Sequence, residues 1–207
     1  MSPAHVLEPT YLAVKRRLMQ GYWPAGFHLD TTRLAEDLDV STSPIRDSLN
    51  RLAGERMVDF EPGAGFQVPR FDEKQLHDLL EVSCCLAVAA VHRLVYPAAL
   101  VAASGSPEAA HRFLQLAQAT GNGELAGAVS HINDHLAAVR LLDATVLREP
   151  DSELQALERA IDERDDASNL VSILARYHAR RQRHARDDVR LLEMGIRRDA
   201  TGRPTGS

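Results

Sequence analysis

Cysteine is scarce in this sequence, with only two residues in 207. The two are adjacent, Cys84 and Cys85, inside an apolar stretch with helical spacing. This arrangement favours two reduced thiols packed in a core over a disulfide framework, and it favours a cytoplasmic protein. No apolar run approaches the roughly 20 residues that a membrane-spanning helix needs. Residues 1–9 also lack a basic region followed by an apolar stretch, so we expect neither a secretory leader nor a membrane partner.

An excess of positive charge is also missing, since the formal net charge is −5 at pH 7. A nucleic-acid-binding protein with this balance needs its positive charge gathered on one surface. Hydrophobic residues make up 44% of the chain, which is enough for a sizeable core and argues against wholesale disorder. The sequence shows no glycine-rich phosphate loop after a strand and no nucleophile elbow, so no residue set indicates an enzyme.

The first third of the chain has the pattern of three short helices followed by a hairpin. Apolar residues at helical spacing predict a helix over about 10–21, ended by Gly21. Asp30 or Thr31 can cap a second helix, and Ser41 can cap a third that turns Ile45, Leu49 and Leu52 inward. Two apolar segments, 57–60 and 66–68, flank a turn rich in glycine and proline. The pattern predicts a helix-turn-helix with a two-stranded wing.

From Asp72 onward the pattern is helical only. We expect helices over about 72–96, from Ser106-Pro107 to 121, over 124–145, from Pro150-Asp151-Ser152, and from Asp165 or Asp166 to about 195. Residues 200–207 show no apolar periodicity. The predicted fold is therefore mainly α, an N-terminal winged helix-turn-helix followed by an all-helical bundle. We expect domains at residues 1–70 and 71–198, and a disordered tail at 199–207.

The segment Tyr11 to Val68 resembles the DNA-binding domain of the GntR family along its whole length. The matching residues, in chain order, are Tyr11, Lys15, Gly21, Leu34-Ala35-Glu36, Leu38, Val40-Ser41, Ser43-Pro44-Ile45-Arg46-Asp47-Ser48-Leu49, Leu52, Gly65-Phe66 and Val68. The resemblance implies that the third helix reads the major groove of double-stranded DNA through its N-terminal end. The DNA-binding residues expected on this basis are Arg33, Ser41, Thr42, Ser43, Arg46, Asn50, Gly63 and Gly65.

Two positions depart from the family pattern. The family usually has Arg where this chain has Thr42 in the third helix and Ala64 in the wing. The first 70 residues also hold eight basic and nine acidic side chains, a poor balance for a domain whose affinity comes from phosphate contacts. DNA binding that is weak, altered in sequence preference or lost is therefore an open alternative.

The helical half resembles the ligand-sensing domain of the FCD (FadR-like) subgroup, here divergent and shortened. The best local match is Ala160-Ile161-Asp162, Arg164-Asp165 and Ala167, followed by His178. Many members of the subgroup hold a metal through an Asp, a His four residues later and two further His, and the metal helps to bind a carboxylate. Here Asp134 and His178 fit, whereas Ala138 and Leu154 offer no donor atom. We therefore expect an effector site at Asp134 and His178, no metal and no cofactor.

Other residues leave weaker alternatives. Ser83 and Ala87 stand where the subgroup usually has Arg and Glu. His131 and His135 are four residues apart on one predicted helix and form a possible relocated metal site, although a partly exposed pair is the plainer interpretation. Five arginines in the last helix are expected on a solvated face: Arg176, Arg180, Arg181, Arg183 and Arg186.

The functional hypothesis is a sequence-specific transcription regulator, controlled by a small-molecule effector in the helical domain. A homodimer held by the C-terminal helices would read a pseudo-palindromic operator, because the two-fold axis of the protein then matches that of the DNA. The alternative is a GntR-like scaffold that has lost DNA binding and serves as a ligand-binding or protein-interaction module. The operator, the identity of the effector, and the choice between repression and activation are not encoded in any pattern we recognise.

Overall fold

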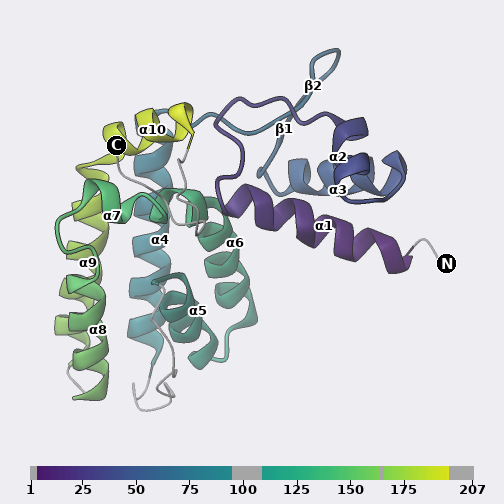
Figure 1. The fold of residues 1–207 in the computed structure, drawn as a ribbon. Coiled ribbons are helices and arrows are strands. Elements are labelled where there is room, and N and C mark those ends of the chain that lie inside the picture. Colours follow the sequence, from purple (N-terminus) through teal and green to yellow (C-terminus); the bar gives the residue numbers. More distant parts are fainter. Residues whose placement is uncertain (1–3, 95–108, 164–165, 196–207) are drawn as a thin grey trace. The chain divides into compact units, whose positions relative to one another are not determined.

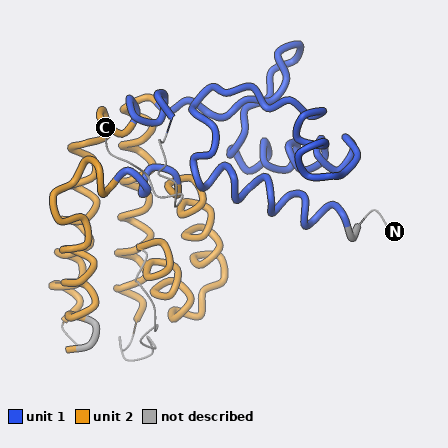
Figure 2. Tube along the Cα trace, viewed as in Figure 1, with its two compact units in different colours: residues 1–71, 138–142, 189–207 blue, residues 72–137, 143–188 orange. Residues whose placement is uncertain are grey.

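A computed structural model of the chain describes residues 4–94, 109–163 and 166–195. Its elements are helices and one small hairpin (Figure 1). The chain divides into two compact units (Figure 2). The N-terminal unit comprises residues 1–71, 138–142 and 189–207, and the helical unit comprises residues 72–137 and 143–188. The predicted fold class is confirmed, with a winged helix-turn-helix followed by helices.

Three helices and a hairpin build the main part of the N-terminal unit (Figure 1). They are α1 (Ala4–Met19), α2 (Thr31–Asp37), α3 (Thr42–Gly54), β1 (Asp59–Glu61) and β2 (Gly65–Gln67). One apolar core joins them, and its most buried members include Val14, Ile45, Leu49 and Leu52. Burial of these side chains is the main favourable term that holds the three helices together. The predicted inward face of α3 is confirmed.

Helix α1 begins earlier than the sequence predicts, at Ala4 instead of about residue 10. Pro9 lies inside it and removes one backbone donor, which is why the pattern suggested a later start. Glu8, in the part of the helix that the sequence did not predict, forms an ion pair with Arg51 of α3. The end of α1 is as predicted, since Gly21 adopts a φ of +60° that most other residues avoid.

The two strands form an antiparallel hairpin in which Phe60 pairs with Phe66. The turn between them contains Gly63 and Gly65, with φ of +88° and +83°. Both angles lie in the left-handed region that glycine adopts without steric cost. The wing is therefore confirmed, although each strand has three residues.

The helical unit contains α4 (Glu73–Arg93), α5 (Ala109–Ala119), α7 (Asp143–Val146), α8 (Ser152–Asp162), α9 (Ala167–Gln182) and most of α6 (Gly123–Arg140). The last helix, α10 (Ala185–Met194), begins in this unit. Helix α4 packs against α5 and α9, and α8 packs against α9. Asp72 caps α4 through the Gln75 amide in a full capping box, and Asp166 caps α9, as predicted.

Two long helices of the prediction are broken in the structure. The helix expected over 124–145 ends at Arg140 and resumes as α7, and the helix expected up to residue 195 breaks after Gln182. The first break places Asp143 at the start of α7, where its carboxylate accepts hydrogen bonds from Arg181. Apolar periodicity continues across both breaks, so it could not reveal them. Some predicted features lie wholly or largely outside the described residues. They are the helix end at 94–96, the helix start at Ser106-Pro107, the alternative cap Asp165 and the disordered tail 199–207.

The two cysteines differ from the prediction of two core thiols. Cys84 is half-buried and Cys85 is exposed. Adjacent residues on a helix point about 100° apart, so only one of the two can approach the packed face. Among the described residues, no helix is long and apolar enough to cross a membrane.

Candidate functional site

The N-terminus of α3 is open, whereas that of α2 is occupied by a side chain. Asp30 accepts hydrogen bonds from the Thr32 and Arg33 amides at 2.7 and 3.0 Å, which caps α2. Ser41, at the same place before α3, makes no such side-chain bond. The first amides of α3 therefore remain available to an external acceptor, and the positive end of the helix dipole favours an anion there.

The predicted DNA-binding side chains of α2 and α3 are all on the surface. This exposed set is Arg33, Ser41, Thr42, Ser43, Arg46 and Asn50. Within the described residues, neither Arg33 nor Arg46 forms an ion pair. A guanidinium group that faces water without a partner can reach a phosphate or a guanine edge at little cost.

Two other cationic side chains of the N-terminal unit, Lys15 and Arg51, already form ion pairs. Lys15 binds Glu55 at 3.1 Å, and Arg51 binds Glu8 at 2.8 Å and lies 3.6 Å above the Tyr11 ring. Burial opposes ionisation of Glu55, but hydrogen bonds from Tyr11 and Lys15 outweigh it and lower the pKa of that carboxyl group. These pairs join α1 to α3. Arg46, nearer the N-terminus of α3, takes no part in them.

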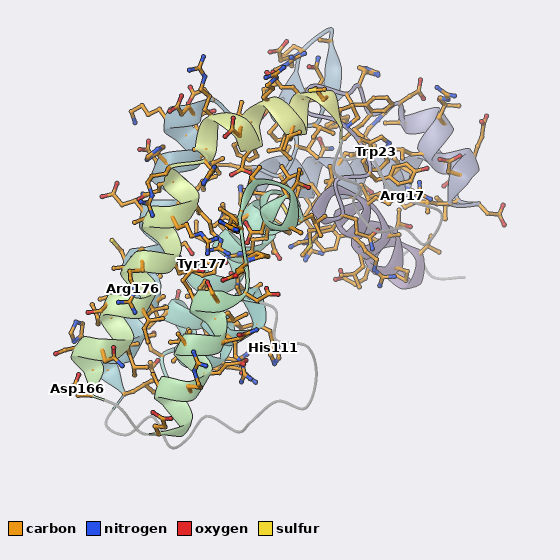
Figure 3. The ribbon with its side chains drawn as sticks, turned by 60° about the vertical axis from the view of Figure 1, so that its left-hand side comes forward. Arg17, Trp23, His111, Asp166, Arg176 and Tyr177 are labelled. Atoms are coloured by element: carbon orange, nitrogen blue, oxygen red, sulfur yellow. The ribbon has the colours of Figure 1, made fainter. Side chains whose placement is uncertain are left out.

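A further pair ties α1 to α2. Arg17, labelled in Figure 3, lies 3.4 Å from an Asp37 carboxylate oxygen and 5.5 Å from the centre of the Tyr22 ring. Within the first 70 residues, the excess of one acidic side chain therefore does not show how the charges are used. Many carboxylates cap helices or pair internally, while Arg33 and Arg46 point outward.

The wing contributes backbone more than charge. Gly63 has no neighbouring atom within 4 Å of the place where a Cβ would lie, so the tip is open. At Gly65 a Cβ would meet His28 Nε2 at 3.1 Å, which means that an exposed imidazole lies against the wing. Ala64, between the two glycines, is exposed. Sequence reasoning missed His28, because only the pairing of residue 28 with Gln67 brings it to the hairpin.

His178, one of the two predicted effector residues, is buried in the helical unit with an exposed fraction of 1%. Its Nδ1 lies 2.8 Å from the Leu174 carbonyl oxygen and its Nε2 lies 3.0 Å from Ser83 Oγ. A carbonyl oxygen only accepts, so Nδ1 donates, and when the ring is neutral its Nε2 accepts the Ser83 hydroxyl proton. The ring also stacks on Phe113 with centroids 5.4 Å apart. Ser83 thus holds the nitrogen that a metal would need.

Asp134, the other predicted effector residue, is half-buried on α6. On the same helix the rings of His131 and His135 lie 4.5 Å apart. Ala138 offers no donor atom, and Leu154 is packed in the core. Among the described residues, no three His, Cys, Asp or Glu side chains gather as a metal site requires. The residues present therefore do not fit the metal that the FCD subgroup implies.

Arg181 contradicts the prediction that the arginines of the last helices line a solvated face. It is buried, with an exposed fraction of 3%, and its Nη2 lies 2.6 Å from Asp143 Oδ2. Its guanidinium also lies 3.4 Å above the Tyr177 ring, a residue of α9 labelled in Figure 3. Arg180 binds Glu153 of α8 at 2.8 Å. Arg176, by contrast, is exposed as predicted.

Asp188 lies close to this buried pair. It has an exposed fraction of 1%, and its Oδ1 has no hydrogen-bond partner in the described part of the chain. Burial raises the pKa of its carboxyl group to about 7, and the nearby Asp143 and Asp187 carboxylates add to the rise while Arg181 opposes it. No sequence pattern distinguishes Asp188 from Asp187, because the two differ only in the direction that α10 gives them.

Comparison with known proteins finds similarity in the first part of the chain. Residues 8–68 match the family model described as "Bacterial regulatory proteins, gntR family". The HTH-type transcriptional regulator McbR of Escherichia coli K12 is 32% identical over 78 residues, a match that covers 38% of this chain and 35% of the relative. The chain thus aligns in sequence with about a third of that protein.

Solved structures extend the similarity to most of the chain. The structure of E. coli McbR/YncC superposes with a TM-score of 0.69 at 18% identity, over 87% of this chain and 97% of that one. A GntR structure from Rhodococcus sp. RHA1 gives a TM-score of 0.70 at 14% identity, over 86% of this chain and 96% of that one. At these identities the likeness concerns the fold alone.

Proposed function

We propose that the chain is a sequence-specific DNA-binding transcription regulator, on the premise that its residues 8–68 match the gntR family of bacterial regulatory proteins. Helix α3 would enter the major groove by its N-terminal end, as recognition helices do. The observation that carries the proposal is the open N-terminus of α3 with Arg46 in its first turns, together with Arg33 on α2; both arginines are exposed and form no ion pair among the described residues.

Each predicted contact residue has a role in this proposal. The hydroxyls of Ser41, Thr42 and Ser43 and the free amides of α3 would bind phosphate. Arg46 and Asn50, one and two turns into the helix, would reach base edges. Arg33 on α2 would contact the backbone, and the wing backbone at Gly63 and Gly65 would approach a neighbouring groove or phosphate. The roles of the α3 residues follow from their positions on the helix, because only the first turns of a recognition helix reach the floor of the major groove.

We further propose that the chain acts as a homodimer, with domains at residues 1–70 for DNA and 71–198 for dimerisation and sensing. A two-fold dimer would bind a pseudo-palindromic operator. The effector, a small molecule that we expect to be a carboxylate, would bind in the helical unit near Asp134 and His178. To use His178 it must displace Ser83 from Nε2, so binding and rearrangement of α4 against α9 would be linked. We propose no catalytic activity, no cofactor and a cytoplasmic location.

A second function has one specific observation in its favour. Thr42 and Ala64 are both exposed at the places where the family usually carries arginine, so two phosphate contacts would be missing. A scaffold that has lost DNA binding and acts as a ligand-binding or protein-interaction module would explain these two residues.

Selection of bound sequences from random double-stranded DNA with the purified full chain separates the two functions. We expect enrichment of an inverted repeat whose half-sites are about one helical turn apart, or a multiple of it. The affinity for that sequence should fall as salt rises, with a slope that reports the number of phosphate contacts. No enrichment over random DNA would refute the regulator and leave the scaffold.

A further inference from the structure

His28 is an exposed side chain that the folded chain brings to the wing. Residue 28 pairs with Gln67 of β2, on the side of that strand away from β1. Leu29, the next residue, has an exposed fraction of 2% and turns into the core. Successive side chains of an extended segment point to opposite faces, so His28 points outward, in agreement with its exposure.

The imidazole of His28 lies at the place where Gly65 has no side chain. A Cβ at Gly65 would lie 3.1 Å from Nε2 of His28, and 3.9 and 4.0 Å from the two ring carbons beside it, Cδ2 and Cε1. The nitrogen is therefore the ring atom nearest to the Gly65 backbone. Because glycine allows close approach of a ligand, a phosphate oxygen that reaches this backbone would meet Nε2, which donates a hydrogen bond when the ring is protonated.

The start of α2 supplies the charges on one side of His28. Asp30 caps α2, and its carboxylate accepts hydrogen bonds from the Thr32 and Arg33 amides at 2.7 and 3.0 Å. The bonds from Arg33 and Thr32 lower the pKa of this carboxyl group, and the charge of His28 adds to their effect. Asp30 is thus held by the end of the helix, and it forms no ion pair with the imidazole in the described part of the chain.

The hairpin supplies two carboxylates on the other side. The register pairs Asp59 with Gln67 and Glu61 with Gly65, and directly paired residues share one face of a sheet. Both carboxylates are exposed on β1, about two strand spacings or roughly 10 Å across the sheet from the segment that carries residue 28. They repel phosphate, so this face of the wing needs a cation before it can approach DNA.

We propose that protonated His28 binds a phosphate of double-stranded DNA beside the wing. The tip of the wing, Gly63 to Gly65, carries no charge of its own, and His28 reaches it from a different segment of the chain. Histidine changes its charge between about pH 5 and pH 8, so this contact would make DNA binding stronger as the pH falls. The inference rests on the proposed regulator and adds to it a contact that no sequence pattern indicates.

Salt dependence at two pH values tests this contact in the full-length chain, with the duplex recovered by the selection as the probe. At pH 6 and 0.1 M salt, His28→Ala should weaken binding about five- to tenfold and make the slope of log affinity against log salt shallower by about one, because one phosphate contact is lost. At pH 8.5 the two proteins should differ by less than about twofold, since a neutral imidazole carries no charge. His28→Arg should keep the steeper slope at both pH values, and the uncharged His28→Gln should behave like His28→Ala.

Two further variants control the experiment. His111→Ala removes an exposed imidazole of α5, labelled in Figure 3, and should change neither affinity nor slope. Glu61→Gln distinguishes a phosphate contact from an ion pair within the wing. It should strengthen DNA binding, and His28→Ala should still weaken binding in that background.

Three results would each overturn the inference. They are a wild-type slope in His28→Ala at pH 6, an equal loss of affinity at both pH values, and a loss that disappears in the Glu61→Gln background. If selection enriches DNA but the His28 variants bind it normally, only this contact is refuted. If selection enriches no DNA, the proposed regulator and the contact are refuted together.

Discussion

The two units treat their polar side chains in opposite ways. In the N-terminal unit, Arg46 and the N-terminus of α3 lie on the surface without internal partners in the described structure. In the helical unit, His178 and Arg181 are almost fully buried, and each is held by hydrogen bonds to neighbouring helices. A polar group exposed to water remains available to a ligand at small cost, whereas a buried group must first break an existing bond.

The difference indicates where binding can be fast and where it must be coupled to rearrangement. DNA can meet the exposed face of α2 and α3 without any change in packing. A ligand that reaches His178 must replace Ser83, and one that reaches Arg181 must replace Asp143. Removal of buried partners should therefore lower stability, and removal of exposed ones should lower only affinity.

The largest effect is expected at the Arg181–Asp143 pair. Asp143→Ala removes the carboxylate 2.6 Å from a guanidinium that is 3% exposed and leaves that charge poorly compensated. We expect a loss of about 3–5 kcal/mol in the free energy of unfolding, measured with urea. Lys74→Ala, which removes an exposed ion pair with Asp78, serves as the control and should cost far less, because water screens an exposed pair. An equal loss of unfolding free energy in the two variants would contradict the expected difference between a buried and an exposed ion pair.

Asp188 should make stability depend on pH. Its pKa is about 7 in the folded chain and near 3.8 when unfolded, so the unfolded state releases its proton first as pH rises. Stability should therefore fall between pH 4 and pH 7 by roughly 1.4 kcal/mol per unit, up to several kcal/mol, and then level off. Asp188→Asn should remove this fall, so that the variant is the more stable protein at pH 8 and nearly equal at pH 4. Parallel stability curves for the two proteins would show that Asp188 ionises freely.

On the exposed side, Arg46→Ala should change affinity without changing stability. Loss of one base or phosphate contact should weaken binding to the selected DNA by about 1–3 kcal/mol, as measured by fluorescence anisotropy. The melting temperature should not move, because Arg46 forms no ion pair among the described residues. Arg176→Ala, on the exposed face of α9, is the matched control and should leave DNA affinity intact. Unchanged affinity in Arg46→Ala would exclude it as a contact.

The smallest effect is expected from Ser83→Ala. The substitution leaves His178 Nε2 without the hydroxyl 3.0 Å away and should cost about 1–2 kcal/mol in chemical denaturation. Ser172→Ala is a suitable control, since its hydroxyl bonds to a carbonyl on an exposed turn of α9. A cost no greater than that of the control would mean that the His178–Ser83 bond adds nothing to the core.

Much of the N-terminal unit could be predicted because its rules are local. Asp30 caps α2, Gly21 ends α1, and Ile45, Leu49 and Leu52 face inward, each as the spacing indicates. The early start of α1 was not predicted, and its first turns include Glu8, which pairs with Arg51, 43 positions away. The breaks after Arg140 and Gln182 could not be predicted from the sequence either, because the apolar periodicity continues through them.

The candidate sites divide in the same way. The exposure of the proposed DNA-binding residues of α3 could be predicted from the sequence, because helix position alone decides which residues stand at the exposed start of α3. The contacts of His178 with Ser83 and of Arg181 with Asp143 join residues 95 and 38 positions apart. The burial of Asp188 beside Arg181 likewise has no local pattern. The sequence by itself determined the winged helix-turn-helix and its outward face, since capping and periodicity act within one or two turns. Only the tertiary structure decided which polar groups of the helical unit meet in its core, because their partners come from different helices.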